Sequence, residues 1–273
     1  MKSYISLSQF KARLSPLTAT TYDTDILGLL QHTSDQLDHE CHRFFECQEG
    51  VRYAEGSGTT LLFNDDVLSL SAVALDMDGD GTYETPMAAT DYILYPLNEY
   101  PKMYMKTRSS TGLSFPSIRA GIKLTGVFGY GDGYTATPYD ASGAVLATGG
   151  ISAIATTHTL AQGYGMLFSP GQTLRIDSEQ MFISNASGDI LTLERAQNGT
   201  TAAIHLAAAV IYHYHYHGPI VEATMIQAIR WWKRRESAYQ TQSGSAEMGT
   251  LVVYKGLDDD VKRIVEHFRK HPL

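Results

Sequence analysis

The sequence predicts an α+β fold: a helical bundle core with a small antiparallel sheet, an inserted all-β domain and a C-terminal docking helix. Three observations predict it. Apolar residues recur every three or four positions near both ends of the chain. Strand-forming residues broken by turns fill residues 50–131. Residues 133–217 are dense in Gly, Ala, Ser and Thr and contain short apolar runs.

The composition is that of an ordinary globular chain of 273 residues, 43% of them hydrophobic. No apolar run approaches the roughly 18 residues that cross a bilayer. The polar start at Met1–Tyr4 predicts no signal peptide, so we expect a protein made and kept in a cytoplasm. The net charge of −8 excludes a general nucleic-acid binder. Cys41 and Cys47 face different ways on a predicted helix, so we expect reduced thiols.

Two helices are predicted in the N-terminal part. Ser6 or Ser8 can cap a short helix that runs to Leu14, and a longer helix should follow from Asp23 to Glu46. The longer helix has one apolar stripe, as a helix docked on a core requires. The stripe consists of Ile26, Leu30, Thr33, Leu37, Cys41 and Phe44.

Strands are predicted in two sets. The first set, which should form the small antiparallel sheet, covers 59–63, 67–75, 91–95 and 121–130. The second set, which should form a small barrel or sandwich in the inserted domain, covers 174–176, 181–184, 190–195 and 209–217. Ser187–Asp189 fits a hairpin loop within the second set.

The C-terminal part returns to helical periodicity, with a helix predicted over 219–240, a short strand over 251–254 and a terminal helix after Asp258. The terminal helix is too short to be stable alone in water, so its apolar stripe needs a partner in this chain or in another. The stripe consists of Val261, Ile264, Val265 and Phe268. The helix over 219–240 carries a basic cluster, Lys233, Arg234 and Arg235. This cluster contacts a DNA backbone or an acidic partner, or it is simply solvated.

One acidic segment has the beginning of a calcium loop, Asp76-x-Asp78-Gly79-Asp80-Gly81-x-x-Glu84. Hard Ca²⁺ takes six to eight oxygen ligands around a sharp turn, which these residue types supply. The twelfth loop position is Met87, where a bidentate Glu is required, and both flanks are predicted strands rather than helices. A plain hairpin turn is the competing interpretation.

A second candidate metal site is the run Tyr212 to His217, which alternates Tyr and His. In a strand, His213, His215 and His217 share one face, and imidazoles two residues apart can chelate zinc. No further ligand is evident in the sequence, so a polar strand face is the alternative. No nucleophile elbow or Walker motif is present, so we predict no catalytic residues and a protein that is not an enzyme.

Five segments occur in a set order: a short helix, a long helix from Asp23, an Asp-Tyr-x-Leu-x-Pro segment at 91–96, a Gly-Tyr strand at 121–130 and a Pro-led helix with a basic end at 219–235. This order resembles the adaptor (head–tail connector) family of tailed bacteriophages. In that family the last helix follows the strand directly, so 133–217 is interpreted as an insertion. Within it, 170–181 and 194–205 look like a small β-module of other phage proteins.

The resemblance divides the chain into two parts of an adaptor core at 1–132 and 218–244, the inserted domain at 133–217, and a strand with a portal-docking helix at 245–273. It implies a structural ring, usually twelvefold, in the neck of the virion, assembled in the cytoplasm of the bacterial host. The ring would lie below the portal protein, extend the DNA channel and receive a stopper or tail-completion protein. The docking residues would be Val261, Ile264, Val265, Phe268 and Arg269. Double-stranded DNA would pass without sequence-specific contact, because an acidic wall repels phosphate.

Three alternatives stay open. The chain could be another phage neck or tail protein, such as a stopper or baseplate component. It could be a calcium- or carbohydrate-binding β-module. For the protein itself no cofactor is expected, with Ca²⁺ at residues 76–84 as the open exception. An enzyme is the third. Chelation separates the calcium module from the adaptor, because a calcium module loses stability when its ion is removed and an adaptor does not.

Overall fold

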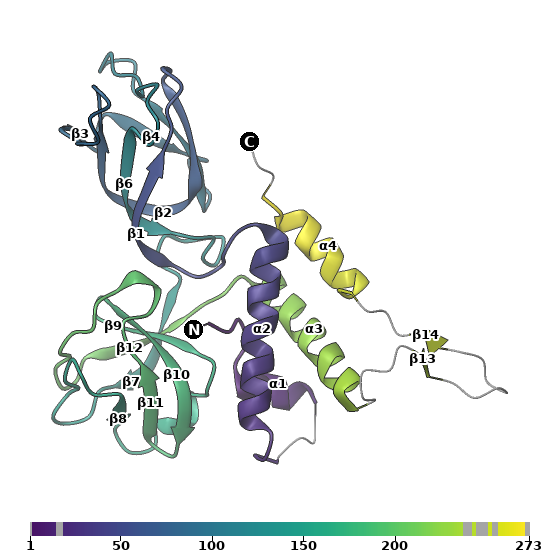
Figure 1. Ribbon diagram of the computed structural model, residues 1–273. Coiled ribbons are helices and arrows are strands. Elements are labelled where there is room, and N and C mark those ends of the chain that lie inside the picture. Colours follow the sequence, from purple (N-terminus) through teal and green to yellow (C-terminus); the bar gives the residue numbers. More distant parts are fainter. Residues whose placement is uncertain (1, 15–18, 237–241, 244–250, 253–255, 271–273) are drawn as a thin grey trace. The chain divides into compact units, whose positions relative to one another are not determined.

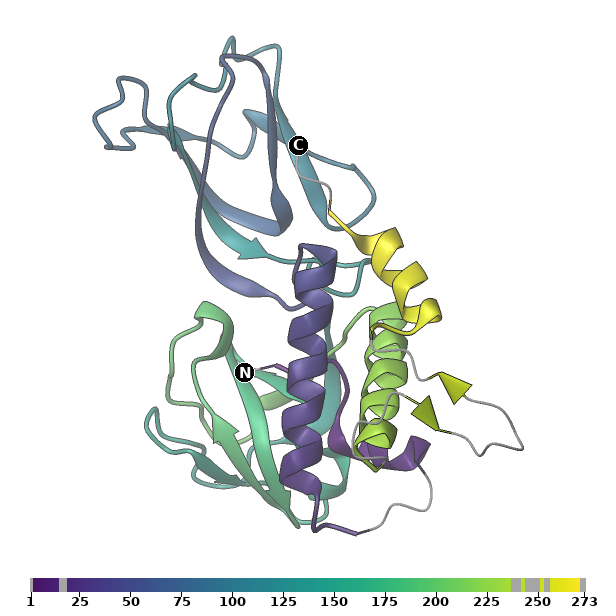
Figure 2. The ribbon, with the colours of Figure 1, turned by 45° about the vertical axis from the view of Figure 1, so that its right-hand side comes forward.

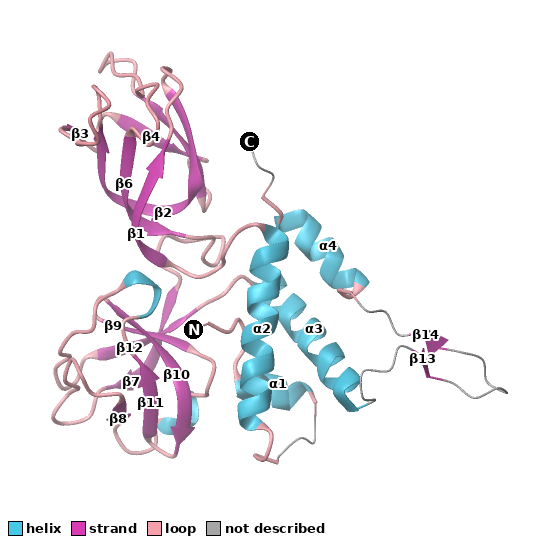
Figure 3. Cartoon of the chain, in the orientation of Figure 1, coloured by secondary structure: helices cyan, strands magenta, loops and turns pink. Residues whose placement is uncertain are grey.

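The computed structural model describes residues 2–14, 19–236, 242–243, 251–252 and 256–270. Within these residues it contains four α-helices and two six-stranded antiparallel sheets, with one further pair of short strands (Figures 1 and 3). The fold is therefore mostly β, and the predicted helical bundle core is wrong. Every helix among the described residues is too short or too polar to span a bilayer.

The chain forms two compact units. Unit 1 consists of Met1–His42, Asp140–Gln197 and Thr201–Leu273, and unit 2 consists of Arg43–Tyr139 and Asn198–Thr200. Unit 1 combines all four helices with one sheet, while unit 2 contains the other sheet. The interpretation of 133–217 as an insertion into an adaptor core concerns ancestry rather than contacts, and it stays a prediction.

The helices of unit 1 are α1 (Leu7–Arg13), α2 (Asp23–Cys41), α3 (Gly218–Glu236) and α4 (Asp259–Phe268). Ser6 caps α1, because its side chain accepts the Gln9 N–H while the Gln9 side chain accepts the Ser6 N–H over 2.7 Å. α2 ends at Cys41 and not at the predicted Glu46, because His42 adopts a left-handed backbone conformation with φ 52°.

Helices α1, α2 and α3 come from opposite ends of the sequence and pack together (Figure 2). An apolar core joins them. Five of the six predicted stripe residues of α2 are buried, and the sixth, Phe44, follows the helix. Helix α4 packs on α3 and α2. The helical core consists of Ile5, Leu7, Phe10, Ile26, Leu30, Met225, Ala228 and Trp232.

The sheet of unit 1 has the order β7-β12-β9-β10-β11-β8. Its strands are β7 (Tyr139–Val145), β8 (Thr157–Thr159), β9 (Thr173–Ile176), β10 (Glu179–Ser187), β11 (Ile190–Glu194) and β12 (Val210–Tyr214). The predicted hairpin loop joins β10 to β11, and β12 is shorter than the predicted 209–217. Leu174, Ile183 and Leu191 belong to a second, separate apolar core.

The sheet of unit 2 has the order β1-β6-β2-β5-β4, with β3 paired to β2. Its strands are β1 (Gln48–Ala54), β2 (Leu61–Leu75), β3 (Thr85–Met87), β4 (Tyr92–Tyr95), β5 (Lys102–Thr107) and β6 (Ile122–Phe128). It encloses a third core, which includes Val73, Phe115 and Leu124. At Gly129, just after β6, φ is +127° and a Cβ would lie 1.9 Å from the carbonyl oxygen of Glu46. Only glycine fits there.

A short pair, β13 (Gln242–Ser243) and β14 (Leu251–Val252), follows α3. The predicted strand over 251–254 extends into residues outside the described part of the chain, and so does the end of the predicted helix over 219–240.

The bundle prediction failed because two apolar cores of the described residues belong to the sheets rather than to the helices. The helices have clear periodicity, but several strands do not. β1 and β7 each contain a glycine, and β8 has only three residues, so neither alternation nor length marks them as strands. The amount of sheet was therefore underestimated.

Candidate functional site

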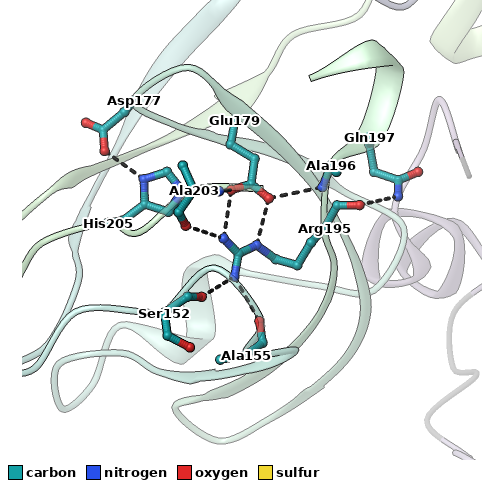
Figure 4. A network of polar contacts seen from close by, with 9 residues as sticks. All are labelled: Ser152, Ala155, Asp177, Glu179, Arg195, Ala196, Gln197, Ala203 and His205. Atoms are coloured by element: carbon teal, nitrogen blue, oxygen red, sulfur yellow. Dashed lines mark hydrogen bonds and ion pairs between the residues drawn. The ribbon is translucent and has the colours of Figure 1, made fainter. Parts of the chain in front are cut away.

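A buried polar network in the sheet of unit 1 was missed from the sequence (Figure 4). Glu179, the first residue of β10, is fully buried, and the Arg195 side chain, just after β11, is nearly so. The Arg195 Nε and Nη2 each donate to one carboxylate oxygen of Glu179 over 2.7 Å. This bidentate ion pair is the strongest hydrogen-bonded arrangement of a guanidinium and a carboxylate. It offsets part of the free-energy cost of burying both charges.

Backbone groups complete the surroundings of Glu179. The N–H groups of Ala196 and Ala203 donate to its carboxylate over 3.0 and 2.9 Å. Burial alone would raise the pKa of Glu179, but the hydrogen bonds, first among them that from Arg195, lower it to about 2. The carboxylate is therefore ionised at neutral pH.

The rest of the Arg195 guanidinium ties down two loops (Figure 4). Its Nη1 donates to the carbonyl oxygens of Ser152 and Ala155, each over 2.8 Å, and its Nη2 donates to that of Ala203 over 2.7 Å. All five guanidinium N–H donors are used within the protein. The pair consequently acts as a structural crosslink, since no donor is left for a substrate.

His205 extends the network toward the surface. Its Nε2 lies 2.9 Å from Glu179 Oε2, and its Nδ1 lies 2.7 Å from the carboxylate of Asp177, which is exposed. The buried imidazole thus links an inner and an outer carboxylate. Through this ring the network reaches the turn between β9 and β10.

The acidic loop, residues 76–84, connects β2 to β3 in unit 2, so both of its flanks are strands. Asp76, Asp78, Asp80 and Glu84 each offer an oxygen atom, and these four atoms lie within 4.8 Å of one another. The residue types and their convergence suit a hard cation such as Ca²⁺. At position twelve, however, Met87 belongs to β3 and is buried.

Asp76 already has partners within the loop. Its carboxylate accepts the N–H groups of Gly79 and Gly81 over 2.6 and 2.9 Å, and that of Asp78 over 3.2 Å. Burial acts to raise the pKa of Asp76, but these backbone hydrogen bonds lower it below the ordinary value. Such bonds fold the loop without an ion. The geometry therefore suits both a plain turn and a metal site, as the sequence does.

The three histidines of the second predicted metal site have different surroundings. The His213 ring packs 5.0 Å from the Phe168 ring, and burial lowers its pKa. His215 is exposed, and the His217 ring meets the Phe268 ring at 5.1 Å. Among the described residues these histidines form no three-ligand group. His213 and His215 line a cavity of about 220 Å³ beside Tyr4.

The predicted portal-docking stripe packs inside unit 1. Val261, Val265 and Phe268 are buried, and Ile264 is half-buried. α4 contacts α3 and α2, so helices of the same chain supply the partner that the stripe requires.

Both ends of α4 are also attached. The N–H of Asp258, its N-cap residue, donates to the Gln227 side chain over 3.0 Å. Beyond the C-terminal end, the Lys270 N–H donates to the Cys41 carbonyl over 2.8 Å, and Arg269 Nε donates to the Glu40 carbonyl over 3.0 Å. Docking on a portal through the stripe would require α4 to leave this position.

The basic cluster lies in the last turn of α3. Arg235 pairs with Asp25 of α2 over 3.1 Å, and its guanidinium carbon lies 4.7 Å from the centre of the Trp232 ring. Lys233 is exposed and Arg234 is half-buried. Arg235 thus helps to hold α3 against α2. A contact of the cluster with DNA or a partner stays a prediction.

The two cysteines, Cys41 and Cys47, are buried thiols. No protein-family model matches the chain, and no curated protein matches it either. The fold and its contacts are therefore the basis for the proposal that follows.

Proposed function

We propose that the protein is a ring-forming head–tail connector (adaptor) of a tailed bacteriophage, a structural subunit without enzymatic activity. The observation that carries the proposal is the shared core of α1, α2 and α3. More than 170 residues separate the end of α2 at Cys41 from the start of α3 at Gly218, and these helices still pack on one another. This packing supports the order of helices that the resemblance to adaptors implies.

The charge of the chain is compatible with this function. A net charge of −8 on each copy would be repeated around a ring, and a negative channel wall repels phosphate, so that DNA slides rather than binds. The partners in this proposal are further copies of the chain, the portal protein above and a stopper or tail-completion protein below. The location would be the neck of the virion.

The test is to mix the protein with the portal protein of the same phage and examine the product by negative-stain electron microscopy. An adaptor adds a ring of density to one end of the portal. A portal that stays bare at a large excess of the protein would contradict the proposal. The same experiment on a chain that lacks residues 257–273 asks whether α4 attaches to the portal, provided that circular dichroism shows the shortened chain to be folded.

A second candidate function is calcium binding by unit 2, favoured by the four converging oxygens of the acidic loop. Calcium titration during thermal unfolding tests it. A binding site raises the melting temperature as the ion concentration increases, and Asp78→Asn combined with Asp80→Asn abolishes the rise. An adaptor without an ion site melts at the same temperature with calcium or with EDTA.

A further inference from the structure

Three large aliphatic side chains are exposed together at one end of the sheet of unit 1. Ile154 is 91% exposed, and Ile204 and Leu206 are 71% and 76% exposed. We name these three residues the first cluster. They expose a few hundred Å² of apolar surface, which is about the size of the largest patch on a typical soluble monomer, and such a patch is often functional.

The first cluster is held in place by the buried network. Arg195 binds the carbonyl oxygens of Ser152 and Ala155 on one loop and of Ala203 on the other. These carbonyls flank Ile154 and precede Ile204. The loops are also joined by two backbone hydrogen bonds between Ile151 and His205, over 2.9 and 3.0 Å. The apolar side chains therefore project from a firmly ordered surface.

A second cluster lies at the other end of the same β10–β11 hairpin. It consists of Met166, which is 87% exposed, with Leu167 and Ile190, which are partly exposed. The Asp189 carboxylate ties their two segments together, because it accepts the N–H groups of Gly163 and Gly165 over 3.0 and 2.7 Å.

The two clusters cannot cover each other within one molecule. The first lies beside Glu179 at the start of β10, and the second lies at the turn after Ser187, where β10 ends. At about 3.3 Å per residue, the nine residues of β10 separate them by on the order of 25 Å. Between them β10 pairs first with β9 and then, from Phe182 to Ser187, with β11 (Figure 1).

We infer that the occupant of each cluster is a second copy of this chain, with the first cluster of one copy against the second cluster of the next. This inference rests on the proposed ring. A contact between two different patches repeats head to tail, and it closes into a ring when the rotation between copies allows. One kind of contact then covers both clusters of every copy.

The apolar area of the two clusters suits a contact that is stable only when it is repeated around a ring. Two clusters of a few hundred Å² each, with their polar rims, give an interface at the low end of the roughly 1,200–2,000 Å² of specific complexes. A single contact of this size is weak. In a closed ring each copy makes two of them, and the second forms at a high effective concentration.

Light scattering with and without the portal protein tests the inference on paired serine variants. Ile204→Ser with Leu206→Ser removes the first cluster, and Met166→Ser with Ile190→Ser removes the second. Each pair should weaken self-assembly at least tenfold without changing the melting temperature, because the side chains are exposed. The matched control is Leu97→Ser with Met103→Ser, two exposed residues of unit 2, which should assemble like the wild type.

The outcomes separate the interface from the function. If the wild type assembles and the cluster variants assemble equally well, the inferred interface is wrong while the ring proposal stands. If the wild type stays monomeric alone and with the portal, the ring proposal itself is wrong, and the interface inference falls with it.

Chemical crosslinking tests the head-to-tail arrangement. Leu206→Cys and Met166→Cys chains, mixed and treated with a short bis-maleimide, should yield heterodimers, while each chain alone should yield few dimers. Cys41 and Cys47 are buried and should not react. Abundant homodimers of Leu206→Cys would show like patches in contact and would overturn the inference.

Discussion

Arg195 uses every N–H of its guanidinium inside the protein, so the sharpest residue-scale experiment is to remove it. Arg195→Met leaves the Glu179 carboxylate buried without its ion pair, and unfolding by urea should show a loss of about 3–5 kcal/mol. The matched control is Arg13→Met, because Arg13 pairs with Glu222 over the same 2.7 Å at the exposed surface. That change should cost less than about 1 kcal/mol. Equal losses in the two variants would contradict the structural role of the network.

The pKa of Glu179 predicts how stability depends on pH. Its folded value of about 2 lies below the ordinary value of 4.5, so the ionised carboxylate stabilises the fold above pH 4.5, and this contribution is lost as the pH falls toward 2. At 1.36 kcal/mol per pH unit the shift corresponds to about 3 kcal/mol. Urea unfolding between pH 6 and pH 2 should show the wild type losing about that much more than Glu179→Gln. Parallel pH curves for the two proteins would show that Glu179 is not responsible.

At the same scale, the sequence indicates the acidic loop but not the network. Asp76 to Glu84 are neighbours in the chain, so their spacing alone suggests a turn or an ion site. Glu179, Arg195 and His205 meet only because β10 pairs with β11 and the bridge at Ile151 places His205 beside them. Their spacing follows no helical or strand period, so strand pairing had to be known first.

At the scale of elements, replacing two glycines that have different surroundings should change the stability of the protein in opposite directions. Gly28 lies inside α2 with open space around it, so Gly28→Ala should stabilise the protein by about 0.5–1 kcal/mol through helix propensity. Gly129→Ala should destabilise it by more than about 1 kcal/mol, because the new methyl group would overlap the Glu46 carbonyl at a positive φ. Chemical denaturation measures both. If Gly129→Ala left the stability unchanged, the backbone near Glu46 would have moved away from the new methyl group without cost.

Helices could be predicted from the sequence better than strands, for a physical reason. A stripe such as that of α2 repeats over about four turns. Ser6 and Asp258 cap their helices through side-chain hydrogen bonds, and both are residue types that favour this position. β2 was predicted as two strands, 59–63 and 67–75, because the polar segment between them suggests a break. The structure instead continues the strand through that segment with a register shift between Phe63 and Val67.

At the scale of the whole molecule, the balance between helix and sheet depends on which elements share a core. The sequence predicts apolar faces on the helices and a small β-domain over 133–217, but not that the sheet of unit 2 encloses a core of its own. The apolar stripe of α4 illustrates the same difficulty. Its period predicts a partner, and the structure supplies α2 and α3, whereas the resemblance to adaptors suggests the portal. An assembly in which α4 leaves α2 and α3 for the portal would show that the helix exchanges one partner for the other.

The most direct test of the ring proposal is the mass of the complex that residues 1–273 form with the portal protein that the proposal names as the partner, measured by light scattering. The proposal predicts a single species whose mass exceeds that of the portal by a fixed whole number of copies, twelve in the usual arrangement of the family. A mixture in which the portal keeps its own mass while this protein remains a monomer of 30.0 kDa would contradict it.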